Sequence, residues 1–80
     1  MLKLYYNVNM SKPKSPKTLR NRVRECRLKK KISQKELALI LGVTRQTIIA
    51  LEKQKYSPSL HLALRLAKCF DIKVESLFNI

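Results

Sequence analysis

The side chains of this chain that can take part in chemistry are mostly cations. Eighteen lysines and arginines stand against five aspartates and glutamates, which gives a formal net charge of +13 at pH 7. The excess is concentrated at the start, because residues 1–31 carry a net +10 and residues 32–80 a net +3. Such an excess repels itself unless an anion neutralises it. A polyanionic partner is the natural explanation, and a solvated basic face without a partner is the alternative.

The chain lacks the residue groups that enzymes and metal sites need. Cys26 and Cys69 are too few and too far apart for a disulfide framework or a zinc site, so we predict two buried, reduced thiols. His61 is the only histidine, and we expect it at the surface. The sequence contains no glycine-rich phosphate loop and no Cys/His or Ser/His/Asp set. We therefore expect no enzyme, no metal and no cofactor.

The most informative stretch is residues 34–51, QKELALILGVTRQTIIAL. Two helices joined by a turn of three or four residues must cross steeply to share one core. That geometry needs a small residue where the backbones approach, a glycine in the turn and an apolar residue beneath it. Ala38, Gly42 and Val43 meet these needs in order. The inward apolar residues would be Leu37, Leu41, Ile48 and Leu51. The spacing predicts a helix-turn-helix.

Residues 19–78 resemble the five-helix domain of the phage repressor and Cro family, also called the lambda-repressor-like or xenobiotic-response-element family. The segment ISQKELALILGVTRQTIIALEKQKYSPSL, which begins at Ile32, follows the family pattern almost throughout. The resemblance implies an all-α, compact five-helix DNA-binding domain over residues 18–80. It also implies that the second helix lies across the DNA backbone and the third lies in the major groove.

The resemblance assigns roles to individual residues. Base readout from the third helix, at about 44–53, is implied for Thr44, Arg45, Gln46, Thr47, Ile49 and Ala50. Arginine pairs bidentately with guanine and glutamine with adenine, so Arg45 and Gln46 are the foremost candidates. Phosphate contacts are implied for Gln34, Lys35, Lys53 and Lys55. Arg27 and Glu52 are expected to form a structural ion pair. The chain departs from the family at Gln54, where glycine is usual, and at the apolar Ile49.

The elements that position these residues carry local signals. The period of Leu19, Val23 and Cys26 predicts a first helix from Thr18 that closes at the lysines 29–31. Ser33 and Glu36 form a capping box for the second helix, and Gly42 ends it.

Three further signals cover the rest of the domain. Thr44 is expected to cap a third helix that runs through Lys53. Ser57 and Pro58 predict the start of a fourth helix, and Val74, Leu77 and Phe78 suggest a fifth. The expected inward face of the fourth helix is Leu60, Ala63, Leu64, Ala67 and Phe70. We find no strand pattern.

Residues 1–17 are expected to form a flexible basic arm, because lysines alternate with prolines between Lys12 and Lys17. This arm either enters a groove of the nucleic acid or serves as a solubilising tail. No apolar stretch has the length of a signal peptide or a membrane span. A cytoplasmic protein without membrane contact is therefore expected.

The leading functional hypothesis is a transcriptional regulator, a repressor that binds double-stranded DNA in a sequence-specific way. The family commonly binds palindromic sites as homodimers. The expected dimer contacts are Leu62, Phe78 and Ile80. Two alternatives stay open, which are an antitoxin-type interaction module that represses its own operon and a non-specific nucleic-acid binder. Salt dependence and competition distinguish the last from a regulator.

Overall fold

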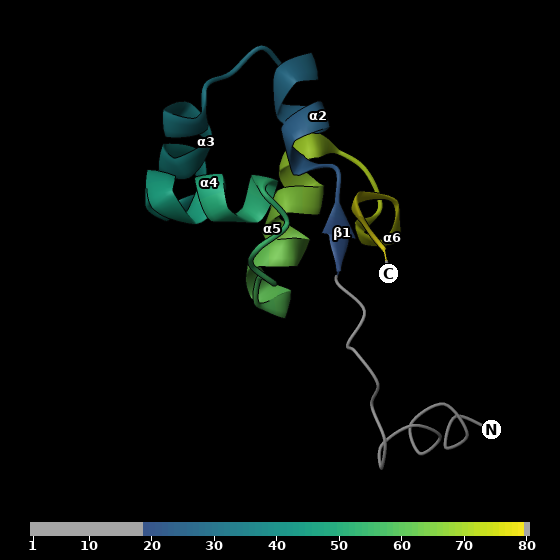
Figure 1. The fold of residues 1–80 in the computed structure, drawn as a ribbon. Helices are drawn as coiled ribbons and strands as arrows, with labels where there is room; N and C mark the ends of the chain where they lie inside the picture. The colour runs from purple at the N-terminus through teal and green to yellow at the C-terminus, as the bar shows by residue number, and fades with distance from the viewer. Residues whose placement is uncertain (1–18, 80) are drawn as a thin grey trace, which may run out of the picture.

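The computed structural model describes residues 19–79, and the predicted basic arm lies outside them. The chain folds as five helices and two very short strands (Figure 1). These elements are β1 (Arg20–Asn21), α2 (Val23–Lys29), α3 (Gln34–Leu41), α4 (Arg45–Glu52), α5 (Leu60–Phe70), α6 (Val74–Leu77) and β2 (Phe78–Asn79). The predicted all-α, five-helix architecture is confirmed. Among the described residues, no helix has the length and apolar character that a membrane crossing requires.

Side-chain caps explain where the three longer helices begin. The Ser33 hydroxyl accepts from the Glu36 amide at 3.0 Å, and the Glu36 carboxylate accepts from the Ser33 amide at 2.7 Å, as the capping box predicts. The Thr44 hydroxyl likewise accepts from the Thr47 amide at the start of α4. The prediction for the fourth helix was wrong by two residues, because Ser59 rather than Ser57 caps α5.

Four helices end in the same way, with one residue in the left-handed conformation. These residues are Lys31, Gly42, Gln54 and Asp71, with φ between 57° and 70°. Each helix then closes with paired backbone bonds of the Schellman type. At the end of α3, for example, the Val43 amide donates to the Ala38 carbonyl at 3.0 Å and the Gly42 amide to the Leu39 carbonyl. Only one of the four positions is a glycine, the residue that this conformation favours.

The left-handed positions predict opposite effects of two substitutions. Gly42→Ala should destabilise the fold by about 1–2 kcal/mol, because an added Cβ meets no neighbouring atom but strains the backbone at φ +70°. Asp71→Gly should stabilise it by about 1 kcal/mol, because it relieves strain and removes a negative charge from a helix carboxyl end. Urea unfolding of both variants measures these differences. Equal shifts in the same direction would contradict the assignment.

One apolar core joins all five helices. Its buried residues are Val23, Leu37, Ala38, Leu41, Ile48, Leu51, Leu62, Ala63, Leu66, Ala67, Phe70, Leu77 and Phe78. The four inward residues predicted for the helix pair are therefore confirmed, and Val43 packs against the core while partly exposed.

The predicted inward face of α5 was partly wrong. Leu60 and Leu64 are 73% and 49% exposed, and Leu62 and Leu66 are buried in their place. Leucines at every second position from 60 to 66 fit two helical faces, so the periodicity did not decide between them. Leu62 and Phe78 belong to the core of this chain, so they are not free for the dimer contacts expected of them. Ile80 lies outside the described residues.

The two strands correct the expectation of a strand-free chain. β1 pairs with β2 in antiparallel register, with Arg20 opposite Asn79 and Asn21 opposite Phe78. The first helix consequently begins at Val23 and not at Thr18, and Phe78 lies in β2 and not in α6. In Figure 1 β1 lies beside α6, so the beginning and the end of the domain meet there. A ladder of two residues is too short to leave an alternating pattern in the sequence.

Candidate nucleic-acid interface

The candidate interface is built on α3 and α4, which pack against each other. Ser33 and Thr44 fix the amino ends of these helices, and Gly42 makes the turn between them. Arg65 of α5 donates hydrogen bonds to the residues just before this turn. Its Nη1 donates to the Leu41 carbonyl at 2.7 Å and its Nη2 to the Ile40 carbonyl at 3.3 Å. A cation there satisfies carbonyls that α3 leaves without partners and favours the negative end of its dipole.

Beneath the two helices lies an ion pair between Arg27 of α2 and Glu52 of α4. The Arg27 Nε donates to Glu52 Oε2 at 2.6 Å, and Nη2 donates to Oε1 at 3.2 Å. The third hydrogen bond of the guanidinium goes from Nη1 to the Ile32 carbonyl at 2.9 Å. The two side chains are only 10% and 3% exposed. This bidentate pair is the one that the family resemblance implies, and it ties the end of α4 to α2 and to the start of α3.

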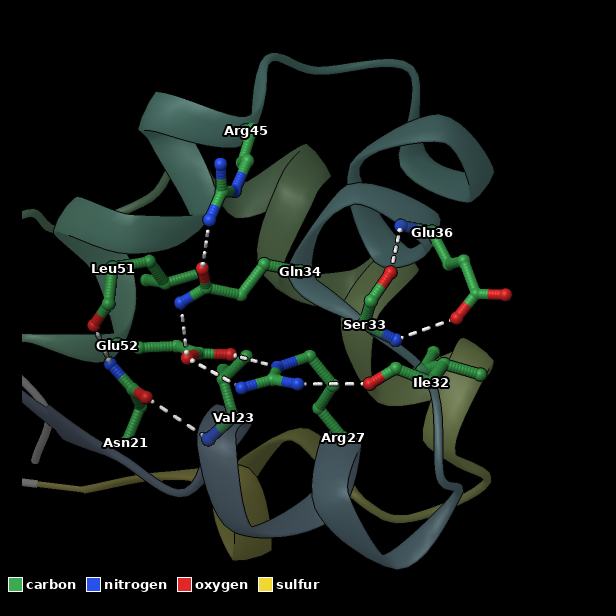
Figure 2. Close-up of polar contacts among 10 residues, drawn as sticks. All are labelled: Asn21, Val23, Arg27, Ile32, Ser33, Gln34, Glu36, Arg45, Leu51 and Glu52. Atoms are coloured by element: carbon green, nitrogen blue, oxygen red, sulfur yellow. Dashed lines mark hydrogen bonds and ion pairs between the residues drawn. The ribbon is translucent and has the colours of Figure 1, made fainter.

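Gln34 connects the buried ion pair to the surface of α4 (Figure 2). Its Nε2 donates to Glu52 Oε1 at 3.1 Å, and its Oε1 accepts from Arg45 Nη2 at 3.5 Å. The second bond is at the limit of hydrogen-bonding distance and is correspondingly weak. A carboxamide has two N–H groups, so one stays available for a phosphate. A series of hydrogen bonds thus runs from the buried ion pair of Arg27 and Glu52 through Gln34 to Arg45, the first residue of α4.

Four of the six residues expected to read bases lie at the amino end of α4, and Ile49 and Ala50 lie in its second half. Thr44, Arg45 and Gln46 are exposed. The three that follow on the same helix, Thr47, Ile49 and Ala50, are half-buried. Thr44 is engaged in capping, and its hydroxyl lies 3.0 Å from that of Thr47. Arg45 and Gln46 therefore offer the longest polar side chains of this surface.

The residues expected to bind phosphate lie at the start of α3 and at the end of α4. Lys35 is exposed in the first turn of α3, beside the half-buried Gln34. Lys53 and Lys55 are exposed where α4 ends. The amino end of α3 adds the positive end of a helix dipole, which favours an anion. Contacts from both ends of the helix pair to the phosphates of the DNA backbone would fix its position on a duplex.

Sequence reasoning missed the part played by Asn21 and Gln54. The Gln54 side chain forms two hydrogen bonds with the backbone of Asn21. The Asn21 side chain donates to the Leu51 carbonyl of α4 and accepts from the Val23 amide at the start of α2. The unusual glutamine at a position where the family has glycine was the available signal. The backbone of Gln54 adopts the left-handed conformation that glycine favours, with φ 63°.

The remaining reactive side chains do not form a second site among residues 19–79. Cys26 and Cys69 are both half-buried free thiols. Burial raises the pKa of the Cys26 thiol, Glu25 adds to the effect, and Lys29 and Arg22 oppose it. A raised thiol pKa keeps Cys26 protonated and unreactive at neutral pH. His61 is exposed, and no cluster of three or more potential metal ligands occurs within this range.

Several known proteins are similar to this chain in sequence. The profile of the helix-turn-helix family matches residues 23–77. A helix-turn-helix transcriptional regulator of Archaeoglobus fulgidus is 50% identical over 60 residues, which cover 75% of this chain and 86% of that protein. The regulator YgzD of Bacillus subtilis is 47% identical over 60 residues, 75% of this chain and 91% of its own.

Two solved structures resemble the fold of this chain. The restriction-modification controller protein C.AhdI of Aeromonas hydrophila superposes with a TM-score of 0.64 at 37% identity, covering 71% of this chain and 83% of its own. A protein from Bacteroides fragilis superposes with a TM-score of 0.69 at 24% identity, over 76% of this chain and 98% of that one. At 24% identity the second likeness concerns the fold alone. By its fold, its capped helix pair and these matches, the chain belongs to the Cro/C1-type helix-turn-helix family of DNA-binding transcription regulators.

Proposed function

We propose that this protein is a sequence-specific transcriptional repressor that reads the major groove through the amino end of α4. The observation that carries the proposal is the pair Arg45 and Gln46, exposed side by side in the first turn of that helix. Both are side chains that recognise base edges by two hydrogen bonds. Such a regulator acts on DNA in the cytoplasm, and we propose that location for it.

Support for readout also comes from the way Arg45 is held. A long side chain loses rotamer freedom when it binds, and this loss weakens binding. Gln34 contacts Arg45 and is itself anchored to Glu52, so part of this ordering precedes the encounter with DNA. The same anchoring leaves one Gln34 N–H for a phosphate. We infer that Gln34 links base readout to positioning on the backbone.

We further propose that the protein binds as a homodimer to a palindromic site. In helix-turn-helix dimers the two recognition helices meet half-sites about one helical turn apart. Because Leu62 and Phe78 are buried within one chain, the pairing surface must use other residues. The proposal is tested through the symmetry of the preferred DNA and not through a particular contact.

Selection of bound sequences from a random duplex library, at near-physiological salt, tests the proposed function. We expect a short palindromic consensus with a preference of the order of 10³-fold over random DNA. The concentration of protein that half-saturates the consensus, compared with a single half-site, reports whether two copies bind together. Uniform recovery of all sequences would overturn sequence-specific regulation and favour the non-specific binder.

The lysines that follow α4 should contribute affinity without contributing sequence preference. In Lys53→Gln/Lys55→Gln, binding to the consensus and to random DNA should weaken by the same factor. Each lost phosphate contact should also reduce the slope of log K against log[salt] by about 0.9. Titrations at four salt concentrations measure this slope. A preferential loss on the consensus would instead assign these lysines to base readout.

A further inference from the structure

The outer face of α5 combines leucines with cations. It consists of the five exposed residues of the helix, which recur with the helical period and are Leu60, His61, Leu64, Arg65 and Lys68. Leu60 and Leu64 are 73% and 49% exposed, and residues four apart on a helix are neighbours on its surface. His61, Arg65 and Lys68 follow the adjacent side of the helix, and α5 contains no acidic residue. An apolar strip on this face is therefore bordered by a basic strip.

The fold itself uses little of this face. The core takes its residues from the opposite side of α5, so Leu60 and Leu64 stay outside it. Arg65 donates to two carbonyls at the end of α3, but a guanidinium has five N–H groups, so three stay available. Within residues 19–79 the ion pair beneath α4 is the only one, so Arg65 and Lys68 have no acidic partner there. Exposed apolar side chains with a polar rim are typical of interaction sites.

Charge favours an acidic protein as the partner of this face. A second copy of the chain would set the same surface against itself, so the cations of one basic strip would meet those of the other. Duplex DNA would neutralise the cations but has no apolar surface of matching shape for two neighbouring leucines. A helix that carries apolar residues beside acidic ones satisfies both strips. Such a helix packs through residues spaced three and four apart, and its carboxylates accept from arginine and lysine.

We propose that the outer face of α5 binds an acidic amphipathic helix of a partner protein. The apolar residues of that helix pack against Leu60 and Leu64, and its aspartates or glutamates pair with Arg65 and Lys68. A helix of eleven residues is about 16 Å long, so the partner contributes about three helical turns. None of the residues expected to contact DNA belongs to α5. The site is therefore separate from the reading surface, and the proposal does not depend on the proposed DNA binding.

Selection from a displayed library of helical peptides, each of about four turns, tests the proposal on the full chain. Excess duplex DNA is present, so peptides that merely compete for a DNA-binding surface are not recovered. We expect the recovered peptides to carry acidic residues beside apolar residues spaced three and four apart. Leu60→Gln/Leu64→Gln should weaken their binding by at least about tenfold, because the apolar contact is lost. Leu39→Gln removes a leucine of α3 that is also 73% exposed, and it should change binding by less than about twofold.

A charge swap tests the basic strip without changing the leucines, so it gives an answer even if the leucine variant fails to fold. Lys68→Glu should weaken binding by about fivefold, and exchanging one glutamate of the peptide for lysine should restore it. Lys73→Glu makes the same change of charge at the start of α6 and should show no such rescue.

Three results would overturn the proposal. The first is the recovery of no acidic amphipathic peptide. The second is equal binding by the native chain and the leucine variant, which would reduce the interaction to general attraction by a basic protein. The third comes from sedimentation of the protein alone, if it shows a dimer that Leu60→Gln/Leu64→Gln abolishes, because this face would then bind a second copy of the chain.

Discussion

Arg45→Ala/Gln46→Ala should fold as the native chain does and lose the preference for the consensus site. Both side chains are exposed, so each substitution should change the free energy of unfolding by less than about 0.5 kcal/mol. A bidentate contact to the right base contributes about 1–3 kcal/mol of discrimination, which is about 5- to 150-fold. Loss of two such contacts should remove most of a 10³-fold preference. Competition between consensus and random duplexes measures the ratio directly.

Arg45→Lys separates base readout from simple charge. Lysine keeps the positive charge but has no planar fork of donors, so it does not reproduce the bidentate contact. Binding to random DNA should therefore stay at the native level, while binding to the consensus falls. Lys73→Ala removes one charge from another part of the surface, at the start of α6, which lies away from α3 and α4 in Figure 1, so it measures the effect of charge alone. An equal loss of preference in Lys73→Ala would contradict readout by α4.

Much of the fold was predictable because its signals are local. Ser33 and Glu36 are three residues apart, and Gly42 and Thr44 stand at the two ends of one turn. Such neighbours specify a helix start or stop whatever lies elsewhere in the chain. The inward residues of the helix pair follow from the same short-range period. The helix-turn-helix could therefore be predicted without any knowledge of the rest of the domain.

The features that escaped prediction depend on contacts between distant segments. β1 pairs with β2 across nearly the whole domain, and Asn21 contacts Gln54 across 33 residues. Nothing in the local sequence of Arg20 and Asn21 distinguishes them from the first turn of a helix. The replacement of glycine by Gln54 was visible as a departure from the family, but only the structure shows the hydrogen bonds that its side chain forms. On α5 the failure was different, since too many leucines left the buried face undetermined.

The candidate site shows the same division. The resemblance assigned Arg27 and Glu52 to an ion pair and Gln34 to a phosphate contact, and it treated these as separate features. In the structure Gln34 donates to Glu52 and accepts from Arg45, so one connected network serves stability and the reading surface. Side-chain networks of this kind polarise and orient one another, and their members do not act independently. Substitutions in the ion pair should consequently affect both properties.

Arg27→Ala is expected to cause the largest loss of stability among these variants, about 3–5 kcal/mol. It leaves the Glu52 carboxylate, 3% exposed, without its ion-pair partner and takes a donor from the Ile32 carbonyl. Domains of this size have a total stability of about 5–10 kcal/mol, so such a loss is a large fraction of it, and the melting temperature should fall by about 15–30 °C. Arg27→Lys keeps the charge without the bidentate geometry, so its stability should lie between those of the native protein and Arg27→Ala. Chemical and thermal unfolding measure all three proteins.

Arg27→Met/Glu52→Leu separates the two tasks of the network. Replacing both charges by apolar side chains of similar size avoids an unpaired buried ion, so stability should return to within about 1 kcal/mol of the native value or exceed it. DNA binding should stay weaker than that of the native protein even though stability is restored. The reason is that Gln34 loses the carboxylate that accepts from its Nε2 and no longer positions Arg45. We expect a folded protein that binds the consensus about two- to fivefold more weakly, because the Gln34–Arg45 contact that is lost is a weak hydrogen bond, which contributes about 0.5–1 kcal/mol. Native affinity in this double variant would show that the ion pair serves the fold alone, whereas weak binding would make Glu52 the anchor of the reading surface.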